Sequence, residues 1–185
     1  MNLKTLKTLA VAATLAVTGL SASANLVTNG DFEAGDLGWN QGNFTTTSFN
    51  GFVPFGNIAL FGGCVGQLCS TNQTISTVFG QTYVFEFEYG SDGNTPNETM
   101  ALFGGQLVFH TVNDTLNTRP GYVHQSFLVT ATSTSTVIDF RIRNDPSYQS
   151  IDNVSVTAAV IPEPASLALV GLGMAGIGFS RRKAK

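Results

Sequence analysis

The sequence predicts an all-β protein, a β-sandwich of the jelly-roll type, and three observations lead to this prediction. The body of the chain is rich in Thr, Val, Phe, Ser, Asn and Gly. It contains no long stretch with a period of 3.6 residues, and Gly or Asn interrupts it at short intervals. Short alternating segments spaced about ten residues apart are typical of sandwiches and jelly rolls rather than of parallel sheets.

The clearest predicted strand covers residues 82–89, where four aromatic residues alternate with polar ones. Because successive side chains of a strand point to opposite faces, the aromatic rings should lie in the core, and Glu86 and Glu88 should face water. A hairpin is expected to turn at Gly104 and Gly105. Strands are expected at residues 26–32, 57–61, 71–78, 82–89, 99–103, 106–112, 122–131, 136–143 and 150–157.

The N-terminal residues 1–24 have the layout of a signal peptide. Lys4 and Lys7 precede an apolar stretch over residues 9–20, and small residues at 22–24 satisfy the rule for signal peptidase. Cleavage there leaves Asn25 as the first residue of the exported protein. The body, residues 25–159, is long enough for one domain with a core.

The C-terminal residues 160–185, called the sorting tail below, resemble a short membrane segment. Sixteen uncharged residues, 165–180, would form a helix of about 24 Å, shorter than the ~30 Å hydrocarbon core. Four glycines weaken this helix. A basic cluster after the apolar run should stay in the cytoplasm, and it consists of Arg181, Arg182, Lys183 and Lys185.

The order of Pro162, Glu163 and Pro164, a Gly-rich apolar segment and a basic cluster resembles the PEP-CTERM sorting signal of Gram-negative bacteria. The resemblance covers residues 161–185. It implies that an exosortase-type membrane protease recognises the three-residue motif and releases or re-anchors the protein outside the cell. A plain C-terminal anchor is the alternative, but it requires neither the motif nor so many glycines.

Charge and cysteine content narrow the class of partner. Residues 25–159 contain three arginines and eleven carboxylates, a formal charge of −8. A field of this sign repels phosphate backbones, which excludes nucleic acid as a partner, and it suits divalent cations. Export to an oxidising compartment predicts a disulfide between Cys64 and Cys69 rather than a metal or redox site.

Residues 25–33, followed by Trp39, resemble the opening strand of the galactose-binding-like jelly rolls of bacterial carbohydrate-binding modules, and residues 150–156 resemble their closing strand. In that family the two strands meet, many members hold one structural calcium there, and the tryptophan packs in the core. The resemblance implies carboxylate ligands from Glu33 and Asp152. Asn29 and Asp31 would be helpers in an oxygen-rich shell. Alternatively, Glu33 and Asp152 only satisfy backbone groups at the strand ends.

A sugar-binding protein is expected to place aromatic rings against its ligand. The candidates lie beside Gly, Asn or Pro in predicted loops, although a loop aromatic more often fills the core. They are Phe49, Phe52, Phe55, Tyr89 and Tyr148.

Catalytic motifs are weak throughout. The chain has no Gly-x-Ser-x-Gly motif, and its two histidines lack zinc-site spacing. Glu86 and Glu88 share one strand face, which suits glycoside hydrolysis but also any exposed face. We therefore expect a non-enzymatic surface or extracellular-matrix protein that binds or organises carbohydrate or exopolysaccharide, for example in a biofilm. The alternatives are a purely structural matrix protein and, less expected, a polysaccharide-acting enzyme.

Overall fold

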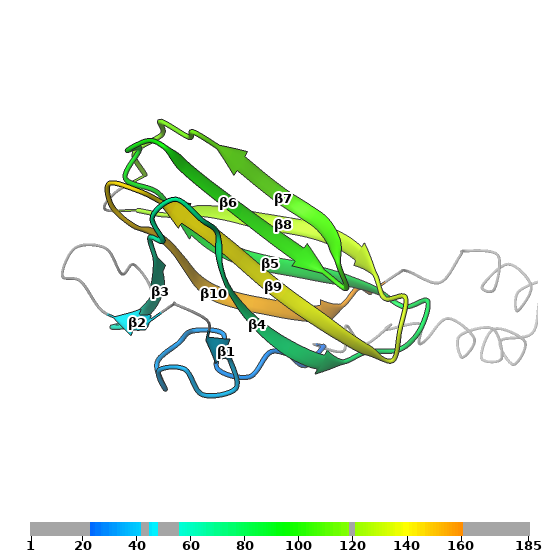
Figure 1. The fold of residues 1–185 in the computed structure, drawn as a ribbon. Helices are drawn as coiled ribbons and strands as arrows, with labels where there is room; N and C mark the ends of the chain where they lie inside the picture. Colours follow the sequence, from blue (N-terminus) through cyan, green and yellow to red (C-terminus); the bar gives the residue numbers. More distant parts are fainter. Residues whose placement is uncertain (1–22, 42–44, 48–55, 119–120, 161–185) are drawn as a thin grey trace, which may run out of the picture.

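The computed structural model describes residues 23–41, 45–47, 56–118 and 121–160, which form two facing antiparallel sheets (Figure 1). The strand order is β1-β4-β9-β6-β7 in one sheet and β2-β3-β10-β5-β8 in the other. The strands are β1 (Asn40–Gln41), β2 (Thr45–Thr47), β3 (Ala59–Gly62), β4 (Cys69–Ser76), β5 (Thr82–Gly90), β6 (Asn97–Phe103), β7 (Gln106–Val112), β8 (Val123–Thr130), β9 (Ser135–Asn144) and β10 (Gln149–Ala158).

This arrangement confirms the predicted β-sandwich. No helix long and apolar enough to cross a membrane occurs within the described ranges. The predicted signal peptide lies outside those ranges, and so does the sorting tail beyond Val160.

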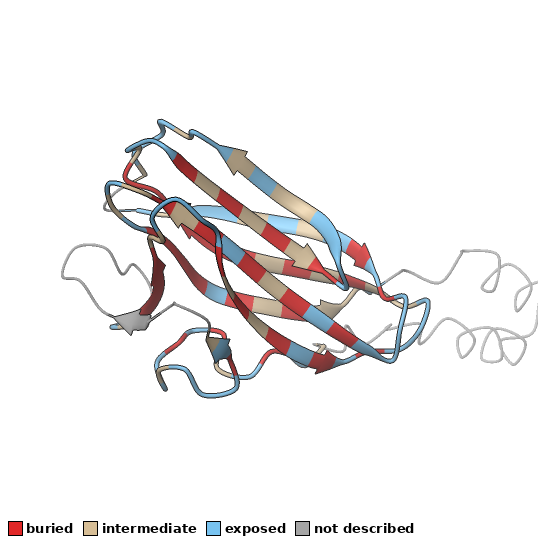
Figure 2. Cartoon of the chain, in the orientation of Figure 1, coloured by how far each residue is buried: buried red, intermediate tan, exposed pale blue. Residues whose placement is uncertain are grey.

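The core lies between the two sheets, where the strands show the alternation of buried and exposed residues (Figure 2). The aromatic face of β5 is buried as predicted, and Phe85 and Phe87 pack against Phe140 of β9 at ring-centroid distances of 5.9 and 5.1 Å. Such ring contacts add to the free energy gained by burial of the apolar surface. The core residues with no exposed side-chain surface include Phe32, Leu60, Phe85, Phe87, Ile138, Phe140, Ile142, Ile151 and Val156.

The opposite face of β5 is less exposed to solvent than predicted. Glu88 is buried, because His124 of β8 lies over it and one ring nitrogen contacts the carboxylate at 2.9 Å. The expectation that Glu88 faces water is therefore wrong, whereas Glu86 stays partly exposed.

Residues 26–32 form bends and turns, so the strand predicted there is wrong. Asn29 and Phe32 adopt φ values of +51° and +54°, which a strand does not allow. The segment still lies along β10, because the Leu26 amide donates to the Val156 carbonyl and the Val154 amide donates to the Gly30 carbonyl, at 2.9 and 2.8 Å.

The other predicted strands are present, with ends that shift by a few residues. The predicted hairpin joins β6 and β7, and its turn residues Gly104 and Gly105 have φ values of +57° and +82°. Left-handed backbone of this kind is accessible to glycine at little cost. The predicted disulfide between Cys64 and Cys69 is also present.

The sandwich has two ends of different character (Figure 1). The turns at residues 77–81, 104–105 and 131–134 lie at the end where β10 finishes, and we call this the tail end. The loops at residues 63–68, 91–96, 113–118 and 145–148 lie at the opposite, distal end.

Gly30 provides a test of how closely the N-terminal segment packs on β10. A Cβ added at Gly30 would collide with the carbonyl oxygen of Val154. We expect Gly30→Ala to lower the free energy of unfolding by about 1–3 kcal/mol, as overpacking does. Chemical denaturation measures the change. Gly121→Ala is the comparison, because its Cβ would lie 3.3 Å from the Thr118 carbonyl oxygen, a much milder contact, and it should cost clearly less stability than Gly30→Ala.

Candidate functional site

A cavity of about 390 Å³ opens on the outer face of the β1-β4-β9-β6-β7 sheet, next to the tail end. We call it the groove. Its walls come from β6, β9 and two turns, the hairpin turn between β6 and β7 and the turn between β8 and β9. Its volume falls in the range of small-molecule sites, about 300–1,000 Å³. The lining residues are Leu102, Gly104, Gly105, Thr132, Ser133, Ser135, Thr136, Val137, Asp139 and Arg141.

Asp139 and Arg141 are the charged residues of the groove. They point outward because the residues between and beside them on β9, Ile138, Phe140 and Ile142, face the core. The Arg141 Nε donates to Asp139 Oδ2 at 2.8 Å. The second carboxylate oxygen, Oδ1, is buried without a hydrogen-bond partner among the described residues.

An orphaned buried acceptor of this kind costs about 1–3 kcal/mol. A ligand that turns the carboxylate toward the groove and donates a hydrogen bond to Asp139 Oδ1 would recover that free energy. The guanidinium of Arg141 is about half exposed, so its remaining N–H groups are available to a ligand oxygen.

The pairing of strands β4, β9 and β6 places further polar and aliphatic residues beside Asp139 and Arg141 on the outer face of the sheet. Asn72 of β4, Asp139 of β9 and Leu102 of β6 are paired side by side in one row, and Ser70, Arg141 and Met100 form the next row. Polar and aliphatic groups therefore alternate along the outer face. None of the ten residues that line the groove is aromatic.

The sequence patterns did not single out any groove residue as a binding candidate. The available signal was the spacing of Asp139 and Arg141, since opposite charges two residues apart on a strand share one face. The pairing with β4 and β6 that completes the groove depends on contacts far apart in the sequence.

The aromatic candidates do not gather at the groove. Phe49, Phe52 and Phe55 lie outside the described residues. Tyr89 is 3% exposed and its ring packs on Phe109 at 5.3 Å, so it belongs to the core rather than to a binding surface. Burial also raises the pKa of the Tyr89 hydroxyl. Tyr148 is half exposed, but it lies at the distal end.

Trp39 packs in the core as expected. Its ring lies 5.2 Å from that of Phe32 and 6.2 Å from that of Phe140, and its indole N–H donates to the Asn29 carbonyl at 3.0 Å. Burial of both faces of the indole excludes Trp39 as a platform for a ligand.

The predicted calcium residues meet beside β10. Asp152 is completely buried, and its Oδ1 accepts a hydrogen bond from the Asn153 amide at 2.7 Å. Its Oδ2 has no partner among the described residues. Burial, followed by the nearby carboxylates of Glu33, Asp31 and Glu88, raises the pKa of Asp152 to about 7.

The other members of this set have backbone partners. Glu33 Oε1 accepts hydrogen bonds from the amides of Asn57 and Ile58 at 2.5 and 3.0 Å, which lowers the pKa of Glu33. The Asn29 side chain accepts from the Ala34 amide at 3.0 Å and donates to the Gly35 carbonyl at 2.9 Å. Glu33 therefore satisfies backbone groups, as the alternative interpretation expects, and Asn29 also has backbone partners.

In the part of the chain that the structure describes, no group of three or more His, Cys, Asp or Glu has a metal-binding arrangement. The orphaned Oδ2 of Asp152, with three further carboxylates nearby, nevertheless fits a cation with oxygen ligands, because a positive charge would compensate an otherwise unfavourable buried group. The calcium site therefore stays a prediction.

A further cluster of titratable side chains lies on the outer face of the β2-β3-β10-β5-β8 sheet and consists of Glu86, Glu88 and His124. The His124 Nδ1 lies 2.9 Å from Glu88 Oε1 and its Nε2 lies 3.6 Å from Glu86 Oε1. Ser126 also donates to Glu86 at 3.0 Å. The hydrogen bond with Glu88 is the main cause that raises the pKa of His124 above its ordinary value of 6.5.

This contact predicts a pH-dependent contribution to stability. A histidine whose pKa is higher in the folded protein than in the unfolded chain stabilises the fold below pH 6.5, and the contribution is lost as the pH rises through the folded pKa. We expect His124→Gln to melt below the wild type at pH 5.5 and at the same temperature as the wild type at pH 8.5. Melting curves at the two pH values measure this, and an equal deficit at both would contradict it.

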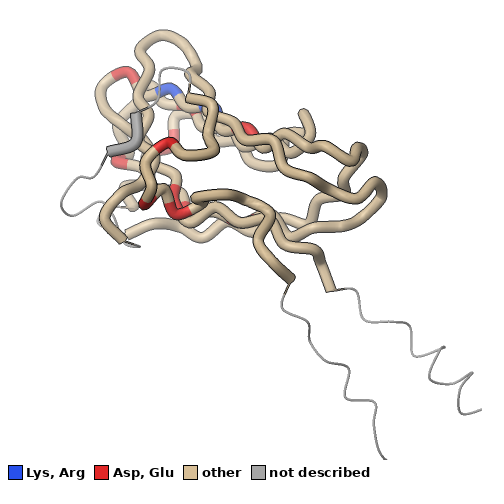
Figure 3. The backbone as a smooth tube through the Cα atoms, turned by 90° about the horizontal axis from the view of Figure 1, so that it is seen from below, with Lys and Arg blue, Asp and Glu red and all other residues tan. Residues whose placement is uncertain are grey.

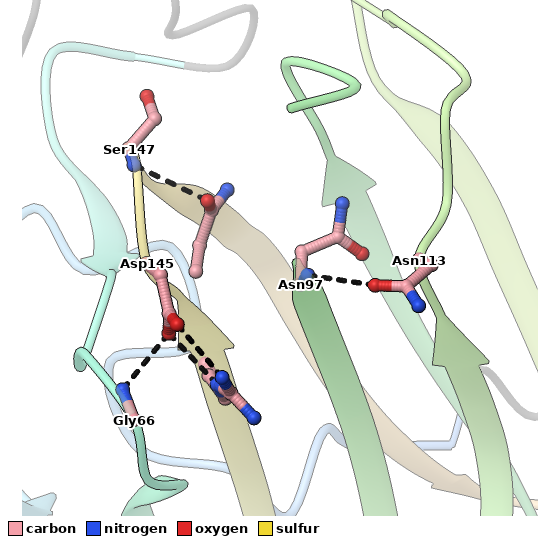
Figure 4. Close-up of polar contacts among 7 residues, drawn as sticks. Gly66, Asn97, Asn113, Asp145 and Ser147 are labelled. Atoms are coloured by element: carbon pink, nitrogen blue, oxygen red, sulfur yellow. Dashed lines mark hydrogen bonds and ion pairs between the residues drawn. The ribbon is translucent and has the colours of Figure 1, made fainter. Parts of the chain in front are cut away.

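The distal end is held by polar contacts (Figure 4). Asp145 accepts two hydrogen bonds from Arg143, both at 2.7 Å, and one from the Gly66 amide in the disulfide loop at 2.9 Å. Arg143 is the main cause that lowers the pKa of Asp145 to about 2. The backbone amide of Asn97 donates a hydrogen bond to the Asn113 side chain, and the backbone amide of Ser147 donates one to the Asn144 side chain. These hydrogen bonds fix the distal loops. The polar groups that make them are therefore engaged within the protein.

Solved structures with the same fold include carbohydrate-binding modules and cyclases. TmCBM61 in complex with β-1,4-galactotriose has a TM-score of 0.57 at 14% identity, over 74% of this chain and 100% of that chain. A family 16 carbohydrate-binding module has a TM-score of 0.53 at 13% identity, over 72% of this chain and 99% of that chain. The Stig cyclase Fisc from Fischerella sp. TAU has a TM-score of 0.53 at 15% identity, over 75% and 98%.

Identities this low indicate a shared fold and no more, and the fold agrees with the predicted jelly roll. No curated protein matches the chain in sequence. Residues 160–183 match the model of the PEP-CTERM protein-sorting motif, as the resemblance predicted. The chain therefore carries a PEP-CTERM sorting motif behind a β-sandwich body with the fold of carbohydrate-binding modules.

Proposed function

We propose that this protein is an exported, non-enzymatic carbohydrate-binding protein that holds its ligand in the groove. The observation that carries the proposal is the pair of Asp139 and Arg141 in an open cavity. The arginine is about half exposed, and Asp139 Oδ1 lacks a partner among the described residues. Saccharides present many hydroxyl groups, each of which can donate and accept, so they match a carboxylate and a guanidinium side by side.

In this mechanism one sugar hydroxyl donates to Asp139 Oδ1, and Arg141 donates to a neighbouring ligand oxygen. Leu102 and Val137 contact the C–H surface of the ring and exclude water, which strengthens both hydrogen bonds. The neighbouring row of Ser70 and Met100 would allow a polymer to continue across the sheet. The likeness to TmCBM61, which was solved with a galactotriose, supports an oligosaccharide or polysaccharide as the class of ligand.

The sorting tail supplies the destination. A PEP-CTERM motif implies processing by exosortase-type machinery after export across the inner membrane. We propose that signal peptidase removes residues 1–24 first, that the apolar run then holds the precursor in the membrane, and that processing delivers the body to the cell surface or extracellular matrix. There it binds or organises exopolysaccharide.

The proposal that the protein is not an enzyme is supported by the contacts that Glu86 and Glu88 make on β5. Glu86 and Glu88 are both in contact with His124, and Glu86 also accepts from Ser126, so these groups stabilise one another across two strands. Release of reducing sugar from the producer's polysaccharide would contradict this part.

The groove is tested by binding of the purified protein to a glycan array and to the producer's own polysaccharide. We expect Asp139→Asn to weaken binding by roughly 10- to 100-fold, the loss of one hydrogen bond to a charged group. Asp36→Asn removes the same charge from an exposed site outside the groove and should bind like the wild type. Absence of wild-type binding to every glycan would overturn the proposal and leave a purely structural matrix protein.

A further inference from the structure

We propose that the tail end of the sandwich docks on the outer surface of the lipid bilayer while the precursor is held by its sorting tail, with Val78 and Phe79 as the side chains that enter the lipid interface. The inference rests on the membrane insertion of the tail that is part of the proposed function. The surface consists of residues 77–81, the neighbouring turn at 131–134, and the end of β10 with Val160.

Hydrogen bonds fix the turn that carries Phe79 beside the point where the tail begins. The Gly80 amide donates to the Ala131 carbonyl at 2.8 Å, and the Ala159 amide donates to the Thr82 carbonyl at 3.0 Å. The Thr77 amide donates to the Thr134 carbonyl at 3.0 Å. The two turns and the end of β10 therefore form one surface (Figure 1).

Chain length brings this surface to the membrane. Five residues, 160–164, separate the end of the body from the apolar run that starts at Ala165. Even fully extended, five residues span no more than roughly 17 Å. The apolar run is itself shorter than the hydrocarbon core, so a short span draws its flanking residues toward the bilayer. The tail end therefore lies at the lipid headgroups whenever the tail is inserted.

The exposed side chains at this end suit a lipid interface. Val78 is 64% exposed, Phe79 is 71% exposed and Val160 is 60% exposed. Exposed apolar residues at one place, beside a segment that enters the membrane, gain free energy when the interface covers them. Three large apolar side chains in water otherwise bring no benefit to the fold.

Charge favours the same orientation. Residues 77–81, 103–106, 131–135 and 158–160 contain no Asp, Glu, Lys or Arg. The acidic residues lie along the backbone away from this end, mostly toward the distal end (Figure 3). A body of net charge −8 would be repelled by anionic headgroups, and the repulsion falls with a screening length of about 8–10 Å. The uncharged end can thus approach a lipid surface that the rest of the body avoids.

The test uses the precursor that remains after removal of the signal peptide, residues 25–185, in vesicles of phosphatidylcholine whose acyl chains carry bromine, a contact quencher of tryptophan. Phe79→Trp places a reporter in the proposed contact, and Leu116→Trp places one at an exposed site of the distal end. The native Trp39 is buried, so its emission is subtracted and also reports that each variant is folded. Flotation with the vesicles reports insertion of the tail.

We expect both variants to float with the vesicles, and only the reporter at position 79 to lose fluorescence in brominated lipid relative to unbrominated lipid. Flotation without any loss at position 79 would overturn the docking and leave the tail insertion intact. Failure to float would overturn the insertion and, with it, the docking. Absence of quenching at position 79 combined with blocked processing of Phe79→Ser in cells would assign the surface to the protease instead, which also overturns the proposal.

Discussion

Replacement of Pro162, Glu163 and Pro164 by alanine is expected to leave almost all of the protein as an unprocessed precursor in the membrane. The three residues lie within the match to the sorting motif, which implies processing by exosortase-type machinery. Proline disfavours helical backbone at the residue before it, whereas alanine is a strong helix former, so the substitution should change the conformation that the motif offers to the protease. The expected change is therefore from nearly complete processing to nearly none.

The measurement is the size and membrane association of the chain in the producing cell, followed by immunoblot of membrane and external fractions. A matched control replaces Val160 and Ile161 by alanine, which changes the first two residues of the matched region and leaves Pro162, Glu163 and Pro164 intact. That control should be processed normally. Normal processing of the triple variant would remove the sorting role from the motif.

Local sequence patterns were sufficient for the strands that alternate strictly. Residues 82–89 and 136–143 place one apolar face against the core, and the structure gives β5 and β9 close to those limits. The hairpin at Gly104 and Gly105 was equally predictable, because its backbone has the positive φ that glycine accepts.

The prediction of strands failed where a polar side chain takes the place of the backbone hydrogen bonds between strands. Residues 26–32 were predicted as a strand, but Asn25 accepts hydrogen bonds from the Val27 and Val156 amides, and Asn29 caps a turn through the Ala34 amide. Asparagine offers the backbone such local partners, so the segment follows β10 without joining the sheet as a strand.

The candidate site was the least predictable part, because the way neighbouring strands pair decides which residues lie side by side in it. Glu88 is buried by His124, which is 36 residues further along the chain. The groove similarly needs β6 and β9 to pair so that Leu102 lies beside Asp139. No single segment contains this information, whereas the sorting tail was recognisable because its three parts are contiguous.

Calcium is expected to raise the melting temperature of this protein, and Asp152 determines the response. A ligand that binds only the folded state stabilises it by about 2.7 kcal/mol at about 100 times its dissociation constant. For a domain of this size that corresponds to a shift of about 10 °C. Calorimetry of the protein with excess chelator and then with calcium measures the shift, and identical melting under both conditions would count against a site at Glu33 and Asp152.

The variant Asp152→Asn separates this site from general salt effects. In chelator at pH 8 the wild type carries a buried carboxylate whose pKa is raised to about 7, so it is charged and lacks a partner for Oδ2 among the described residues. Because the raised pKa means that stability falls as the pH rises from about 4 to 7, the amide should melt above the wild type at pH 8 and lose most of that advantage at pH 5. With calcium the order reverses, since the amide has lost the charge that attracts the ion, while Asp36→Asn keeps the full calcium response.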